Sequence, residues 1–343
     1  MGNPVKKKLK IGIIGCGHWG PNHVRNFSSF PDSEVAWVSD LNEERLKFIR
    51  DSYPGIRVSK DYRDIIADPL VDAVVISTPT STHYQIVKDS LAAGKNVLCE
   101  KPLTLRSWES EELVRLAEEK RKTLMVGHVF LYNIGVQKLK EYINSGSIGK
   151  IYYLHSTRVN LGPIRNDVNA VWDLASHDIS IFCYLFDKFP EKVSANGNCF
   201  LRDNIEDVAF VSLMFSGGVL ANAHVSWLDP RKVREIVVVG DKKMIVWNDM
   251  ALEDTLRIYE KSVEGEPYYS DFGDFQLLPK EGNVIVPKLK LMEPLKNQSR
   301  HFIDCLKEGK RPISDGEFGW KVVRVLEAAQ KSLSDGGKVV DLR

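Results

Sequence analysis

A glycine-rich turn, Gly15-Cys16-Gly17-His18-Trp19-Gly20, follows the apolar run Lys10–Ile14 and opens a helical stretch. In a strand–turn–helix unit the glycines have separate duties: a tight turn, close approach of the backbone to a pyrophosphate, and close packing of the helix on the strand. The helix N-terminus adds free N–H groups and a positive dipole end. The turn therefore predicts a parallel α/β domain that binds a dinucleotide through Gly15, Gly17, His18, Trp19 and Gly20.

Asp40 supplies a second part of the same signature, because it ends the next predicted strand twenty residues after Gly20. A carboxylate at this place accepts hydrogen bonds from both adenosine ribose hydroxyls and repels a 2′-phosphate. Leu41 and Asn42 offer no cation that would reverse this preference. The alternative is a structural glycine turn beside an unrelated surface aspartate, but strand, turn and acid in register favour an NAD site.

The first 127 residues alternate short β-branched runs with amphipathic helical stretches, which is typical of a parallel sheet covered on both faces. The predicted strands are Lys10–Ile14, Val35–Ser39, Ala73–Ser77, Asn96–Cys99 and Thr123–Val126. The predicted helices include Asn42–Asp51, Thr82–Ala93 and Ser107–Glu119, with Ser107 as the N-cap of the last. We therefore expect a Rossmann domain over residues 1–127.

After Gly127 the pattern changes to that of an α+β domain over residues 128–343. The predicted elements are helices at Ile134–Ser145, near Trp172–Phe186, at 295–307 and at 317–334, a strand at Ile151–Asn160, and several strands within Lys192–Trp247. Residues 216–218 and 240–242 are predicted hairpin turns, and residues 261–290 a long irregular loop. The domain should contain a large open, mostly antiparallel sheet. Self-association usually covers such a face, so we expect a homodimer or homotetramer.

Two further strand ends carry polar residues. Ser77-Thr78-Pro79-Thr80 precedes Thr82-His83, and Cys99-Glu100-Lys101-Pro102 follows the fourth predicted strand. Because ligands contact the carboxyl ends of strands in open α/β sheets, we expect cofactor contacts from Thr78, Pro79, His83, Glu100 and Lys101. Lys101 could also donate a hydrogen bond to a reacting oxygen. The alternatives are that Ser81 or Thr82 only caps the next helix, and that Lys101 is a solvated loop charge.

Charge and cysteine usage exclude several classes of protein. The formal net charge of +1 argues against a nucleic-acid partner, and no stretch approaches the roughly 20 apolar residues of a membrane span. Five cysteines without CxxC spacing indicate neither a disulfide framework nor a zinc cluster, so we expect a reducing, cytoplasmic location. No pair of histidines has metal-ligand spacing with a third ligand nearby, and we expect no metal.

Taken together, Gly15–Gly20, Asp40, Thr78-Pro79, Glu100-Lys101-Pro102 and the strand ending in Gly127-His128 resemble the Gfo/Idh/MocA family of oxidoreductases. The resemblance covers essentially the whole chain. It implies an NAD-dependent enzyme that oxidises a sugar-like hydroxyl. It also directs attention to Asp173 and His177, whose i,i+4 spacing places both on one face of a helix. Carried over, His177 is the catalytic base, Asp173 supports it or binds substrate, and Lys101 polarises the hydroxyl.

The stretch from Arg158 to Asp173 is similar to a branch of the family that oxidises carbon 3 of UDP-linked N-acetylhexosamines. This resemblance implies a 3-keto sugar nucleotide as product, which in that branch usually passes to an aminotransferase. It makes Arg158 and Arg165 candidates for the diphosphate and Asn160 for a sugar hydroxyl. Three alternatives stay open: UDP-N-acetylglucosaminuronate as substrate, another sugar or inositol, and a regulator of this fold that binds NAD without catalysis.

Overall fold

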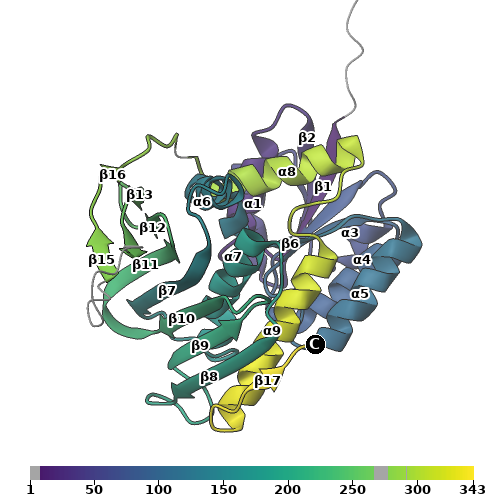
Figure 1. Cartoon of the computed structure of the whole chain (residues 1–343). Helices are drawn as coiled ribbons and strands as arrows, with labels where there is room; N and C mark the ends of the chain where they lie inside the picture. Colours follow the sequence, from purple (N-terminus) through teal and green to yellow (C-terminus); the bar gives the residue numbers. More distant parts are fainter. Residues whose placement is uncertain (1–7, 266–276, 291) are drawn as a thin grey trace, which may run out of the picture. The chain divides into compact units, whose positions relative to one another are not determined.

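The computed structural model describes residues 8–265, 277–290 and 292–343, which form two compact units (Figure 1). We call Met1–Tyr132 with Met292–Arg324 the Rossmann unit, and Asn133–Leu291 with Val325–Arg343 the sheet unit. The sequence-based division assigned everything after Gly127 to the second domain. The chain instead returns to the Rossmann unit, where α8 (Pro294–Glu308) packs against α1 (Gly20–Ser28) and the 3-10 turn η2 (Val129–Tyr132).

The Rossmann unit contains a six-stranded sheet in the order β3-β2-β1-β4-β5-β6, and every neighbouring pair is parallel. The strands are β1 (Leu9–Ile14), β2 (Ser33–Ser39), β3 (Arg57–Ser59), β4 (Ala73–Ile76), β5 (Asn96–Glu100) and β6 (Leu124–Gly127). The chain runs outward from β1 to β3 and then crosses to β4. In such sheets, ligands bind at the carboxyl ends of the strands where the order reverses, which here are the ends of β1 and β4.

Helices connect these strands: α2 (Glu43–Ser52), α3 (Arg63–Ala67), the 3-10 turn η1 (Thr80–Thr82), α4 (His83–Ala92) and α5 (Ser107–Lys120). Asn42 caps α2 by accepting from the N–H groups of Glu44 and Arg45. The prediction that Ser107 is an N-cap is wrong, because Ser107 is already helical and the N-cap is Arg106, without a side-chain hydrogen bond. All four residues of β4 are buried, so this strand lies in the core.

The sheet unit is built on nine strands in the order β16-β13-β12-β11-β7-β10-β9-β8-β17. They are β7 (Ile151–Leu161), β8 (Lys192–Asn198), β9 (Val208–Met214), β10 (Leu220–Ser226), β11 (Leu228–Gly240), β12 (Met244–Asn248), β13 (Leu256–Tyr259), β16 (Val284–Ile285) and β17 (Val340–Asp341). Only β7 and β10 run parallel, which confirms the predicted mostly antiparallel sheet. Both predicted hairpin turns are present, between β9 and β10 and between β11 and β12.

Helices of the sheet unit are α6 (Ile134–Asn144), α7 (Ser176–Phe186) and the later part of α9 (Gly316–Ser334), with a π-helical turn η3 (Val171–Ala175) directly before α7. Residues on β9 alternate between buried and exposed, so one sheet face is core and the other is open. The predicted irregular loop at 261–290 is wrong in part, because β14 (Ser262–Gly265) pairs with β15 (Leu277–Lys280) and β16 joins the large sheet. Strands of two to four residues are too short to show a period. Residues 266–276 lie outside the described residues.

Candidate active site

The glycine turn has the geometry that a dinucleotide requires. Gly15 has a φ of 92°, and a Cβ there would lie 2.8 Å from Thr78 Cγ2. A Cβ on Gly20 would lie 2.4 Å from the carbonyl oxygen of Gly15, so the helix closes tightly on the turn. A Cβ on Gly17 would meet only the Arg45 guanidinium, at 3.7 Å. Gly17 thus leaves the open backbone that a pyrophosphate can approach, whereas Gly15 and Gly20 serve packing.

Asp40 lies directly against this turn. Its carboxylate accepts from the N–H groups of Cys16, at 2.7 Å, and Asn42, at 2.8 Å. Arg45 of α2 also contacts it, with 3.4 Å between Nη1 and Oδ2. Sequence reasoning looked for a cationic residue only at positions 41 and 42. It missed Arg45, which α2 places next to the Asp40 carboxylate. His18 and Trp19 are exposed beside the turn, with their rings 5.1 Å apart.

Glu100 is held from both sides at the end of β5. His23 of α1 is fully buried, and its Nε2 lies 3.0 Å from Glu100 Oε1. The N–H of Lys101 donates to Glu100 Oε2 at 3.3 Å. A Cβ on Gly127 would lie 2.9 Å from that carboxylate, which explains the glycine at the end of β6. Glu100 therefore orients the backbone at Lys101. Sequence reasoning gave His23 no role, since α1 and β5 are distant in the chain.

His83 is buried beneath two turns, which corrects the expectation that it contacts the cofactor. Its Nδ1 lies 2.9 Å from the Pro102 carbonyl oxygen, and its Nε2 lies 2.9 Å from that of Thr78. Burial lowers the pKa of His83, and the two carbonyls and Glu100 oppose this effect. A neutral imidazole has one N–H and donates to one carbonyl at a time. His83 thus connects the strand-end turns that carry Thr78 and Lys101.

The Thr82 hydroxyl oxygen lies 2.8 Å from both Pro79 O and Thr78 Oγ1, and its single O–H donates to one of these oxygens at a time. Thr82 is the N-cap residue of α4, but its side chain makes no cap hydrogen bond to that helix. Pro79 is exposed at this turn. His128 follows β6 and is buried, and burial together with the charge of Lys101 lowers its pKa to about 3. It is therefore neutral at physiological pH.

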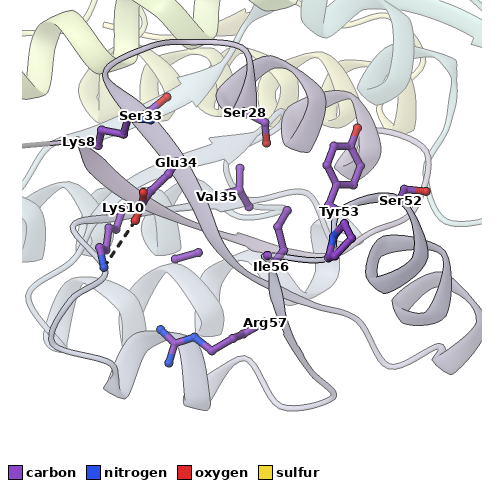
Figure 2. Close-up of a pocket in the computed structure, with 13 residues that line it drawn as sticks. Lys8, Lys10, Ser28, Ser33, Glu34, Val35, Ser52, Tyr53, Ile56 and Arg57 are labelled. Atoms are coloured by element: carbon purple, nitrogen blue, oxygen red, sulfur yellow. Dashed lines mark ion pairs between the residues drawn. The ribbon is translucent and has the colours of Figure 1, made fainter.

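A surface hollow of about 600 Å³ lies elsewhere in the Rossmann unit (Figure 2). The starts of β1 and β2 line it together with residues 52–57. Lys10 and Glu34 form an ion pair across it, with 3.5 Å between Nζ and Oε1. Because this is the amino end of the strands, opposite the glycine turn, the hollow is not the candidate cofactor site.

In the sheet unit, Asp173 lies in the π-helical turn η3, and His177 lies in the first turn of α7. Single π turns inside helices are frequently found at functional sites. Asp173 accepts from Trp227 Nε1, at 3.3 Å, and from Arg165 Nη1, at 3.1 Å. Both bonds fix the orientation of its carboxylate. His177 is partly exposed, and its carbonyl accepts from Ser180 Oγ at 2.7 Å.

Arg158 does not present its charge to a ligand, which corrects the expectation that it meets a diphosphate. It is 3% exposed and forms a bidentate ion pair with Asp178, with Nε–Oδ2 at 2.9 Å and Nη2–Oδ1 at 3.1 Å. Arg165 is more accessible and is shared between Asp167 and Asp173. Asn160 donates to the carbonyl of Gly162.

Within residues 8–265, 277–290 and 292–343, no three His, Cys, Asp or Glu side chains gather in a way that could hold a metal ion. Over the same ranges, no helix has the length and apolar content needed to cross a bilayer.

The site residues therefore fall into two sets. The Rossmann unit places a glycine turn, Asp40 and Lys101 at one edge of its sheet, and the sheet unit places Asp173 and His177 at the start of α7. The first set can bind a dinucleotide, because it offers the N-terminus of α1 directly after the glycine turn and a carboxylate at the end of β2. The second set can accept a proton, because it contains an imidazole, and the oriented carboxylate of Asp173 lies four residues earlier in the chain.

Comparisons with known proteins agree with this chemistry. Residues 9–128 match the "Oxidoreductase family, NAD-binding Rossmann fold", and residues 136–246 match the "GFO/IDH/MocA C-terminal domain". The myo-inositol 2-dehydrogenase of Thermotoga maritima is 28% identical over 95% of this chain and 97% of its own length. The UDP-N-acetylglucosamine 3-dehydrogenase of Acidithiobacillus ferrooxidans is 30% identical over 76% and 79%. The WlbA dehydrogenase of Bordetella pertussis, solved with NADH and UDP-GlcNAcA, superposes with a TM-score of 0.80 at 22% identity, covering 98% and 99%.

The fold and the matched domains define an NAD-dependent oxidoreductase that acts on CH–OH groups. The chain belongs to the Gfo/Idh/MocA family.

Proposed function

We propose that this enzyme oxidises carbon 3 of UDP-N-acetylglucosamine to the 3-keto sugar nucleotide. The observation that carries the proposal is the carboxylate of Asp173, which Trp227 and the partly exposed guanidinium of Arg165 orient four residues before His177. We infer that His177 accepts the proton with the help of this carboxylate, and that Arg165 can meet a diphosphate. The similarity to the 3-dehydrogenase of Acidithiobacillus ferrooxidans supports this substrate.

The proposed mechanism assigns one task to each side chain. His177 takes the proton of the sugar hydroxyl, while Asp173 orients the imidazole and stabilises its charged form. Lys101 donates a hydrogen bond to the oxygen on which negative charge develops. The glycine turn and Asp40 would hold NAD, which would supply the acceptor for the hydride of the same carbon, so that the alcohol would become a carbonyl and NAD would become NADH. Glu100 and His83 hold the turn that carries Lys101.

The substrate is tested by offering sugar nucleotides to the NAD-bound enzyme and following NADH absorbance. UDP-N-acetylglucosamine should reduce the cofactor, whereas free glucose, inositol and UDP-N-acetylglucosaminuronate should do so poorly. If only the uronate reduces the cofactor, the substrate is UDP-N-acetylglucosaminuronate. Reduction by inositol alone would favour the second candidate, an inositol dehydrogenase, which the relative from Thermotoga maritima supports. A regulator would bind NAD and show no reduction with any of them.

We also propose that the open face of the large sheet joins copies of this chain into a dimer or tetramer. Tyr153, Leu220 and Met214 are exposed and lie side by side on β7, β10 and β9. Phe210 on the same face of β9 stacks on His224, with the ring centroids 4.4 Å apart. An apolar patch of this kind is usually covered in solution.

All five cysteines are free thiols, which supports the cytoplasm as the proposed location.

Light scattering after size exclusion should therefore give a mass of at least two chains. Leu220→Glu should lower it toward one chain, because an unpaired carboxylate would have to be buried in the interface. The control is Leu252→Glu, at a residue that is 90% exposed in the segment between β12 and β13. A monomeric wild-type protein, or equal dissociation of both variants, would contradict the proposal.

A further inference from the structure

A buried ion pair ties the helix of the proposed base to the centre of the large sheet. Arg158 lies on β7, between β10 and β11, and Asp178 lies in the first turn of α7. The side chains of Arg158 and Asp178 are 3% and 1% exposed, and both carboxylate oxygens receive a guanidinium N–H. Two parallel bonds of this kind fix an orientation as well as a distance.

The pair has a specific place relative to the proposed chemistry. Asp178 is the residue directly after His177, and the π-helical turn with Asp173 ends at Ala175. Because of the π turn, the side chains of His177 and Asp178 are rotated about the helix axis relative to a continuous α-helix. The Arg158–Asp178 bonds set the rotation of α7 immediately after that turn.

We propose that Arg158 is a positioning residue for His177: through Asp178 it fixes the first turn of α7, and it balances the negative charge next to the base. The proposal rests on the function proposed above, in which His177 accepts the proton. It gives Arg158 a role other than binding the substrate.

The thermodynamics of buried charges favour such a role over a purely stabilising one. Removing two charges from water costs so much that a buried ion pair contributes little net stability compared with apolar side chains of similar size. Breaking it, by contrast, leaves an uncompensated charge. A pair of this kind is suited to define one geometry and one local charge balance.

The other charged groups around the helix start also belong to this balance. Asp173 precedes His177 by one turn and is paired with Arg165, which in turn pairs with Asp167. The two carboxylates within five residues of His177 along η3 and α7, Asp173 and Asp178, therefore each have an arginine partner. Changing Asp178 alters this balance by one charge without touching Asp173.

The charge effect is tested with Asp178→Asn, which leaves the Arg158 cation buried and unable to lose its proton. A positive charge disfavours the imidazolium, so the pKa of His177 should fall by about one pH unit. The acidic limb of the plot of kcat/KM against pH reports the pKa of the base in the free enzyme. It should therefore shift to lower pH by the same amount. Arg158→Met/Asp178→Asn removes both charges and should return the limb to its wild-type position.

The positioning effect is measured as the pH-independent value of kcat/KM, the plateau of the same pH profile. Arg158→Met/Asp178→Asn should lower plateau kcat/KM by about tenfold, because the helix start loses its anchor. Arg158→Lys keeps the charge but cannot form both bonds, so it should lower the plateau and leave the limb in place. The control for lost stability is Val211→Ala, a fully buried site on β9, which should change neither the limb nor the plateau at 25 °C.

Titration of the His177 imidazole by NMR needs no substrate, so it separates this inference from the proposed function. A lower pKa in Asp178→Asn, reversed in the double variant, supports the inference even if UDP-N-acetylglucosamine is not the substrate. An unchanged His177 titration in Asp178→Asn would overturn the charge balance. If Asp178→Asn does not fold, an Arg158→Lys profile equal to wild type in limb and plateau would overturn the positioning role.

Discussion

His177→Ala is expected to lower the rate of the chemical step by about 10²–10⁴-fold, the range for removal of a general base. NAD binding should hardly change, because the glycine turn and Asp40 lie in the other unit of the chain. Single-turnover NADH formation measures the step, and calorimetry with NAD provides the control. Near-normal turnover in His177→Ala would show that this residue is structural and that the base lies elsewhere.

Lys101→Ala should reduce the same step by a similar factor, because the developing alkoxide loses its electrostatic partner. Both residues act on one transition state in the proposed mechanism. The double variant should therefore lose less than the product of the two single losses. Strictly multiplicative losses would mean that the two side chains contribute independently, without coupling between them.

The second large effect concerns the cofactor. The wild-type enzyme should bind NAD much more tightly than NADP, because a 2′-phosphate would meet the Asp40 carboxylate as a like charge. Asp40→Ser should weaken NAD binding by about 10–100-fold, the equivalent of losing hydrogen bonds to a charged acceptor. The same change releases Arg45, which contacts Asp40 at 3.4 Å, so NADP binding should improve without an introduced arginine.

Asp40→Ser/Arg45→Gln is the matched control for this prediction. It should lose NAD affinity as the single variant does but should not gain affinity for NADP, because no cation remains for the 2′-phosphate. Calorimetric titration of the oxidised cofactors measures both. Tight NADP binding by the wild-type enzyme would contradict the role of Asp40, and a full NADP gain in the double variant would contradict that of Arg45.

Local sequence patterns predicted much of the fold because they report local physics. The alternation of β-branched runs with amphipathic stretches gave five of the six strands in the Rossmann unit, and the glycines at 217 and 218 marked a hairpin turn. The pattern failed where elements are very short, as at β3, β14 and β16. It also failed for Ser107, because helix ends vary by one or two residues in ways that spacing does not resolve.

Residue types and their order determined the Rossmann unit, the NAD cofactor and the residues to be considered for the site. Only tertiary structure decided which of them already have partners within the protein. Arg158 and His83 were expected to bind ligands. Arg158 instead forms an ion pair with Asp178, and both ring nitrogens of His83 lie within hydrogen-bond distance of backbone carbonyls. His23 and Arg45 gained partners that spacing did not reveal. The physical reason is that the attraction between two charges depends on the distance between them. The fold sets this distance, and the positions of the two residues in the chain do not give it.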